Sequence, residues 1–292
     1  MKRAMILAAG LACAAPAFAQ LDFGRLIDYG RKAVDAGGKL KEANREFSQD
    51  DEIQLGDGIA ATLLGASPLV KDAGLQRYVN RVGRWIALHS DRPDLPWTFG
   101  VIETQTVNAF AMPGGTILIS RGLVNQLGSE SELAGALAHE IAHVVRRHQL
   151  AAIQSSTNSE VWSSIGKEVA SEAISRRGGD AFGLKSKAAG LGIDAVKNGV
   201  FLRPLDRSME YEADRLGVIL ATRSGYDPYG LPGVLQVLGT MKGDGSGLDI
   251  MATHPAPSDR LSELEKVMPA VEGYANQPRL EGRFKQVVGA AK

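Results

Sequence analysis

Residues 129–145 read Ser-Glu-Ser-Glu-Leu-Ala-Gly-Ala-Leu-Ala-His-Glu-Ile-Ala-His-Val-Val, and this stretch decides the fold around it. Ser129 and Glu132 have the spacing of a capping box, which predicts a helix that begins here and runs to about Leu150. Its apolar residues share one face: Leu133, Leu137, Ile141 and Val144. We therefore expect this face to anchor the helix and the opposite face to present polar groups.

Those polar groups are in His139-Glu140-Ile141-Ala142-His143, which matches the pattern H-E-x-x-H. Residues four apart lie one turn apart on the same helix face, so both imidazoles can reach one Zn²⁺. Glu140 is rotated by about 100° from His139, and can flank the metal as a base without binding it. The pattern predicts a zinc site with His139 and His143 as ligands. Two histidines that only make ordinary hydrogen bonds are the alternative.

A catalytic zinc ion needs a third protein ligand, and Glu210 is the best candidate. Glu210 and Asp214 lie four apart in a helix predicted over about 206–223. Small side chains would let the two helices approach closely; they are Gly135, Ala142, Ala213, Gly217 and Ala221. Asp214 could then accept the free N–H of a ligand histidine. A solvated acidic helix face is the alternative for this pair.

Three further histidines have different expected roles. His254 stands in the turn Thr-His-Pro-Ala-Pro at 253–257. It could stabilise the oxyanion of a tetrahedral intermediate, fill a fourth zinc position in a closed state, or be an ordinary loop histidine. His148, five residues after His143, is expected to point away from it and lie at the surface. His89 belongs to no pattern and is expected to be structural.

The remaining segments predict a small sheet and further helices. Alternation over 97–102 predicts a strand. Residues 107–112 and 116–120 flank Pro113-Gly114-Gly115 and predict a hairpin. Helical spacing of apolar residues predicts further helices at about 53–64, at 75–89 and within 229–270. The fold class is therefore α+β and mainly helical.

The N-terminus has the three parts of a secretory signal peptide. Lys2 and Arg3 give a positive start, and residues 4–15 are apolar or small. Ala17 and Ala19 then form the A-x-A pattern that precedes a cleavage site. We expect residues 1–19 to be removed on export; a short buried N-terminal helix is the alternative.

Composition excludes several function classes. The 292 residues include 33 basic and 33 acidic ones, so no net charge points to nucleic acid or to an anionic membrane. No apolar run after residue 19 approaches the ~18 residues that span a bilayer. The only cysteine, Cys13, would leave with the signal peptide, which excludes disulfides and cysteine catalysis in the mature chain. Lipid anchoring through Cys13 is less favoured, because Gly10 occupies the position three before it.

Four motifs in this order resemble the gluzincin metallopeptidases, which include the CAAX prenyl endopeptidase, the membrane heat-shock protease and soluble periplasmic bacterial relatives. They occupy residues 108–115, 139–143, 207–214 and 253–260. The resemblance runs from about Glu52 to about Leu264. It implies a zincin-like fold with one Zn²⁺ per chain, held by His139, His143 and Glu210. It also implies that Glu140 is the catalytic acid and base.

The resemblance further implies an edge strand beside the cleft, formed by Asn108, Ala109, Phe110, Ala111 and Met112. An extended peptide could add to such an edge through main-chain hydrogen bonds. Asp206 stands where a serine commonly precedes the motif arginine, which leaves the exact helix start open. The segment between the two metal-binding helices is too polar to span a membrane, which resembles the soluble branch. Part of it, within 151–205, could form a lid.

Domain organisation and function follow as expectations. Residues 20–50 are expected to form a helical arm, 51–270 the metallopeptidase domain and 271–292 a C-terminal tail. The expected function is that of a periplasmic zinc endopeptidase acting on unfolded or misassembled envelope proteins, with the outer-membrane assembly machinery as a candidate partner. A periplasmic chaperone or assembly factor with latent proteolysis is one alternative, and a non-peptidase zinc hydrolase is another.

Overall fold

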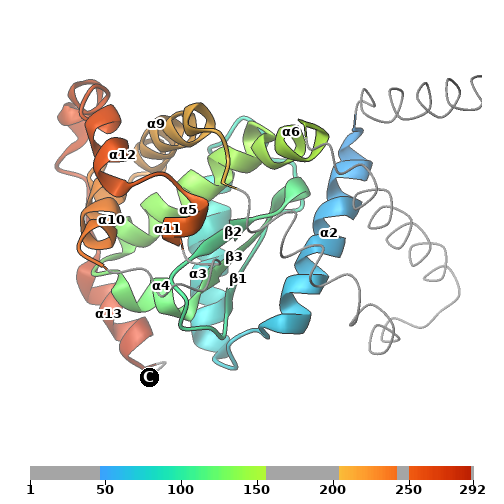
Figure 1. The fold of residues 1–292 in the computed structure, drawn as a ribbon. Helices are drawn as coiled ribbons and strands as arrows, with labels where there is room; N and C mark the ends of the chain where they lie inside the picture. Colours follow the sequence, from blue (N-terminus) through green and yellow to red (C-terminus); the bar gives the residue numbers. More distant parts are fainter. Residues whose placement is uncertain (1–46, 156–203, 242–249, 291–292) are drawn as a thin grey trace, which may run out of the picture. The chain divides into compact units, whose positions relative to one another are not determined.

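A three-stranded mixed sheet lies at the centre of the computed structural model, which describes residues 47–155, 204–241 and 250–290 (Figure 1). The strands are β1 (Thr98–Ile102), β2 (Ala109–Ala111) and β3 (Thr116–Ser120), in the order β1-β3-β2. β3 runs parallel to β1 and antiparallel to β2, with the short 3₁₀ helix η1 (Pro113–Gly115) in the turn. The predicted strand and hairpin are confirmed, and β2 lies at one edge of the sheet.

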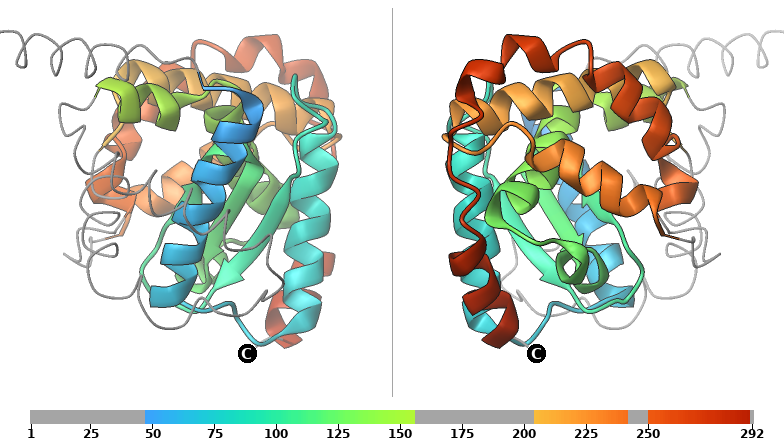
Figure 2. Two further views of the ribbon diagram at one scale, coloured as in Figure 1. Left: turned by 90° about the vertical axis from the view of Figure 1, so that its right-hand side faces the viewer. Right: turned by 90° about the vertical axis from the view of Figure 1, so that its left-hand side faces the viewer.

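The period-two alternation of the strands sends side chains into two separate cores. Four helices cover the two faces: α2 (Gln49–Ala66), α3 (Ala73–Ala87), α5 (Glu130–Val145) and α6 (His148–Ser155). Ile117 and Ile119 pack with α3 and α5. Phe110 and Leu118 pack with α2 and α6 on the other face. Figure 2 shows α2 and α3 on opposite sides of the sheet.

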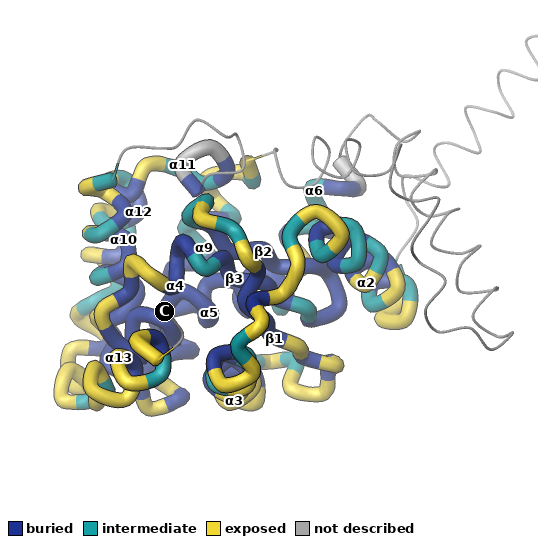
Figure 3. Tube along the Cα trace, turned by 90° about the horizontal axis from the view of Figure 1, so that it is seen from below, coloured by how far each residue is buried: buried dark blue, intermediate teal, exposed yellow. Residues whose placement is uncertain are grey.

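α5 is the most deeply buried helix of the described residues, as Figure 3 shows. Ser129 caps it by accepting a hydrogen bond from the backbone N–H of Glu132, as the sequence predicts. α5 packs along α9 (Arg207–Arg223) and α10 (Gly230–Gly239). At Gly217 a Cβ would lie 3.0 Å from the backbone nitrogen of His139, so this glycine permits the close approach of α9. Gly135 differs from the expectation, because it contacts Leu231 of α10 instead.

The helix predicted to continue to Leu150 ends earlier than expected. α5 stops at Val145, and α6 begins at His148. Between them Arg147 has a φ of 56°, a left-handed conformation that a continuous helix does not allow. Its Nε lies 3.1 Å from the buried carboxylate of Glu52, which holds the turn in place. The chain therefore changes direction directly after the H-E-x-x-H motif.

The C-terminal region forms several short helices and one longer one. They are α11 (Ile250–Thr253), α12 (Pro257–Leu264), η3 (Met268–Ala270), η4 (Glu272–Tyr274) and α13 (Glu281–Ala290). Residues 271–292, expected to be a tail, include α13, whose Phe284 and Val288 are buried in the main core. The two side chains lie four apart and share the face that packs on α3 and α5.

Several expectations fall on residues that the structure does not describe. These are the expected signal peptide, nearly all of the expected arm and most of the proposed lid.

A further short helix, α4 (Arg121–Gln126), follows β3. Among the described residues, no helix combines the length and apolar character needed to cross a membrane.

Candidate metal centre and active site

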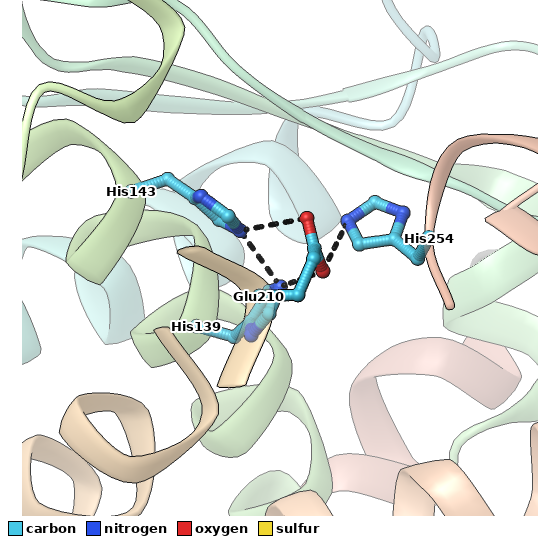
Figure 4. Close-up of side chains that lie close together, drawn as sticks. All are labelled: His139, His143, Glu210 and His254. Carbon is cyan, nitrogen blue, oxygen red and sulfur yellow. Dashed lines mark hydrogen bonds and ion pairs between the residues drawn. The ribbon is translucent and has the colours of Figure 1, made fainter. Parts of the chain in front are cut away.

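Four side chains, from the two helices α5 and α9 and from the turn after α11, converge on one point (Figure 4). One ligand atom from each of them lies within 4.8 Å of the others; the residues are His139, His143, Glu210 and His254. The Nε2 atoms of His139 and His143 are 3.0 Å apart, one turn apart on α5. The carboxylate oxygens of Glu210 on α9 lie 3.7 Å from His139 and 3.6 Å from His143. The helix spacing thus brings the three sequence-derived ligand candidates together.

Glu210 is fully buried between the histidines of this site. Neither of its carboxylate oxygens has a hydrogen-bond partner among the described residues. Burial raises the pKa of Glu210 well above its ordinary value, against the lowering effect of Arg260. A buried carboxylate without partners is costly, and a divalent cation among nitrogen and oxygen donors removes that cost. Imidazole nitrogens and a carboxylate oxygen are a donor set that zinc prefers, so these residues fit the ion.

A hydrogen-bonded carboxylate orients His139. Asp214, one turn after Glu210 on α9, places Oδ1 at 2.9 Å from Nδ1 of His139. Arg260 on α12 donates to both Asp214 oxygens, at 2.9 and 2.6 Å. Burial alone would raise the pKa of Asp214, but Arg260 and His139 hold it well below its usual range. The carboxylate of Asp214 therefore stays charged, and it lies beside a histidine of the candidate metal site, as expected from the sequence. Arg260 belongs to the fourth motif, but the sequence did not suggest its role.

His148 lies in a different place from the one expected. It is 4% exposed, and its Nδ1 lies 3.0 Å from Nδ1 of His143. Its Nε2 lies 3.3 Å from Glu212, which also pairs with Arg146 at 2.7 Å. The prediction of a surface residue is wrong because it assumed a continuous helix, whereas the turn at Arg147 swings His148 back toward His143. Burial lowers the pKa of His148, although Glu212 opposes this.

Glu140 borders a pocket together with the edge strand. The pocket is lined by Asn108, Ala109, Phe110, Ala111, Glu140, Gln149, Leu205, Glu210, Thr253 and His254. Glu140 is 4% exposed and accepts a hydrogen bond from the backbone N–H of Ala111 in β2. Burial raises the pKa of Glu140 to about 7, with Arg260 acting in the opposite direction. Met112, the last residue of the expected edge strand, lies instead in the core beneath α2.

His254 reaches the same centre from the turn after α11. Its Nε2 lies 3.6 Å from Glu210, and the hydroxyl of Thr253 lies 2.9 Å from its Nδ1. Its ring therefore lies among the other candidate ligand atoms and is not an isolated loop histidine. His89 lies on none of these elements and contacts the backbone oxygen of Trp85 at 2.8 Å.

Comparison with known proteins agrees with this geometry. Residues 73–268 match the model of "Peptidase family M48". The chain is 30% identical over 227 residues to the "Beta-barrel assembly-enhancing protease" of Escherichia coli K12, covering 76% of this chain and 44% of that protein. It is 30% identical over 195 residues to the "Mitochondrial metalloendopeptidase OMA1" of Arabidopsis thaliana, covering 66% and 36%. The chain therefore spans less than half the length of these two relatives.

The M48 metallopeptidases use zinc, and the matched region contains all four residues of the candidate metal site. The order of the motifs, the helical zincin-like fold with its small mixed sheet, and the convergence of nitrogen and oxygen donors all agree with that match. The chain belongs to the zinc metallopeptidase family M48.

Proposed function

We propose that the chain is an exported zinc endopeptidase that cleaves unfolded or misassembled envelope proteins. The observation that carries the proposal is the buried Glu210 carboxylate, which has no hydrogen bond to any residue that the structure describes and faces the Nε2 atoms of His139 and His143. These three side chains would hold the zinc. When bound, zinc polarises the scissile carbonyl and lowers the pKa of a nearby water.

Glu140 is the proposed acid and base. It shares the pocket with Glu210, and its carboxylate is fixed by the backbone N–H of Ala111. A pKa raised to about 7 suits a group that takes a proton from the attacking water and then gives it to the leaving amine. The hydrogen bond from β2 also places this carboxylate next to the strand along which a peptide would lie.

The edge strand β2 is the proposed substrate-binding element. Ala109–Ala111 pair with β3 and line the pocket. An extended peptide added to this edge would bind through main-chain hydrogen bonds, which read little sequence. Such binding suits unfolded chains. Asn108 lies at the start of this edge and also lines the pocket.

His254 has two proposed roles that depend on the state of the enzyme. In the present geometry its Nε2 belongs to the ligand group, so it would complete a four-ligand site and latch the centre. Once displaced from Glu210, the same nitrogen could donate to the oxyanion of the tetrahedral intermediate. Proteolysis would then require the turn after α11 to move.

Location and partners are proposed from the N-terminal sequence and the relatives. The signal-peptide pattern supports cleavage after Ala19 and a periplasmic enzyme, with lipid anchoring through Cys13 the less favoured alternative. The name "Beta-barrel assembly-enhancing protease" of the Escherichia coli relative supports outer-membrane assembly machinery as a partner.

The test is the variant Glu140→Gln, assayed on unfolded casein. We expect turnover to fall by about 10²–10⁴-fold, because the amide cannot take a proton, while the zinc content by elemental analysis stays at one ion per chain. His89→Gln is the matched control, since His89 lies outside the site, and it should keep full activity. A Glu140→Gln protein with nearly wild-type turnover would overturn the proposal.

A chaperone or assembly factor with latent proteolysis is the second candidate function. The position of His254 within the ligand group favours it, because a four-ligand centre leaves no position open for the substrate carbonyl. Rescue of an envelope-stress phenotype by the Glu140→Gln protein would support this role, and failure to rescue would support proteolysis.

A further inference from the structure

His143 has a defined partner on the side that faces away from the metal centre. Its Nε2 lies 3.6 Å from Glu210, whereas its Nδ1 lies 3.0 Å from Nδ1 of His148. A ring nitrogen that binds a metal carries no proton, and a neutral imidazole has only one N–H proton, on either Nδ1 or Nε2. If Nε2 binds zinc, Nδ1 of His143 must carry the proton and donate it to His148.

His148 can accept that proton only if its own proton is on the opposite nitrogen. Its Nε2 lies 3.3 Å from the carboxylate of Glu212, which provides the required acceptor. Glu212 pairs in turn with Arg146 at 2.7 Å, and its side chain is 32% exposed. Each interaction in the series from Arg146 through Glu212 and His148 to His143 therefore has one donor and one acceptor. The series begins at the partly exposed ion pair of Arg146 with Glu212.

His139, the other candidate ligand histidine, contacts its orienting carboxylate directly, without a residue in between. Asp214 accepts directly from Nδ1 of His139 at 2.9 Å. Glu212 and Asp214 both belong to α9, the helix that also carries Glu210. One helix thus provides the acidic ligand and, through two independent routes, the acceptors that orient both histidines.

We propose that His148 and Glu212 are positioning residues that act in series to hold His143 in the tautomer and ring orientation that bind zinc. The inference rests on the zinc site proposed above. The turn at Arg147 then has a role, because it brings His148 back to His143, whereas a continuous helix would carry His148 away from it.

The main test compares His148→Asn with His148→Leu, two substitutions of similar size. The Asn amide oxygen can accept from Nδ1 of His143, and Leu cannot. We expect His148→Leu to lower zinc affinity by about 10–100-fold, measured by competition with a chelator, and His148→Asn to retain most of it. The melting temperature of the metal-free protein should be similar in both variants, because the role concerns the ligand. Equal losses of zinc affinity in the two variants would overturn the inference.

A double-mutant cycle tests whether the two residues act in series. Glu212→Gln should lower zinc affinity less than His148→Leu does, and the double variant should be no worse than His148→Leu alone. Losses that add would show two independent effects and contradict the proposal. A Glu212→Leu variant, which removes the acceptor altogether, keeps the test decisive if His148→Leu does not fold, because Glu212 is partly exposed: unchanged zinc affinity in that variant would overturn the series arrangement. A wild-type protein that binds no zinc would instead overturn the proposed function itself.

Discussion

Two glutamates of this chain are equally buried and have opposite surroundings. Glu130 and Glu210 both have 0% exposure. The carboxylate of Glu130 accepts hydrogen bonds from the hydroxyls of Tyr78 and Tyr226, at 2.7 and 2.9 Å, and from the guanidinium of Arg283. Glu210 accepts no hydrogen bond from any described residue.

The difference separates a carboxylate that serves the fold from one that serves a ligand. Glu130 ties three distant segments to the start of α5, and its charge is balanced within the chain. Glu210 has three imidazoles around it, and burial lowers the pKa of His139, His143 and His254, so none of these rings supplies a positive charge at neutral pH. No described residue donates a hydrogen bond to Glu210, and a divalent cation is the group that its neighbours fit.

The largest expected effect is on zinc binding by Glu210→Gln. The amide keeps the size of the side chain but is a much weaker ligand than the carboxylate. We expect zinc affinity to fall by more than about 100-fold, because losing a direct ligand costs more than the loss of a residue that only orients a ligand. Peptidase activity should disappear with the zinc. Chelator competition measures the affinity, and zinc binding at wild-type strength would contradict the ligand assignment.

Glu130→Gln should have the opposite profile. Removing the charge leaves Arg283 and two buried hydroxyls with a poorer partner, so we expect the free energy of unfolding to fall by about 3 kcal/mol. The affinity for zinc should not change, because Glu130 lies outside the ligand group. Urea unfolding and chelator titration of the same protein check both parts. A loss of zinc affinity without a loss of stability would contradict the claim that Glu130 serves the fold and not the metal site.

Tyr226→Phe should weaken the same cluster by less. It removes one hydrogen bond to a charged acceptor, worth about 1.5–3 kcal/mol, and leaves the other donors to Glu130 in place. Tyr229→Phe is a suitable control, since Tyr229 is 45% exposed. Equal stability of Tyr226→Phe and wild type would show that this hydroxyl is not needed.

The smallest expected effect is on the pH dependence of stability. Burial, together with Glu130, raises the pKa of Tyr78 and of Tyr226 above the usual value. Their stabilisation is therefore complete below the unfolded-state pKa of about 10 and is lost as the pH rises through the folded-state values. The double variant Tyr78→Phe/Tyr226→Phe should lose stability less steeply than wild type above this pH in urea unfolding. Identical slopes would contradict the assigned shifts.

Local patterns predicted much of the site. The H-E-x-x-H spacing, the Ser129 cap and the hairpin around Gly114 each depend on residues close in sequence, and all three agree with the structure. The second half of the predicted capping box differs, because the Glu132 carboxylate accepts from the backbone N–H of Gly128. Glu210 was a ligand candidate because its four-residue spacing from Asp214 describes one helix face, and it lies beside both imidazoles.

Other features depend on contacts that no local pattern describes. The partners of Glu130 are 52, 96 and 153 residues away from it. The burial of His148 depends on a left-handed residue, Arg147, whose side chain gives no sign of that conformation. The parallel pairing of β1 with β3 likewise joins strands that no tight turn connects, since β2 lies between them in the sequence.

The most direct test of the account is the stability of metal-free Glu210→Gln. If Glu210 is an unsatisfied buried carboxylate that only zinc stabilises, the metal-free variant should unfold with a free energy at least equal to that of metal-free wild type. Added zinc should then stabilise wild type and leave the variant unchanged. A metal-free variant destabilised as strongly as Glu130→Gln, with zinc still stabilising it, would contradict the account.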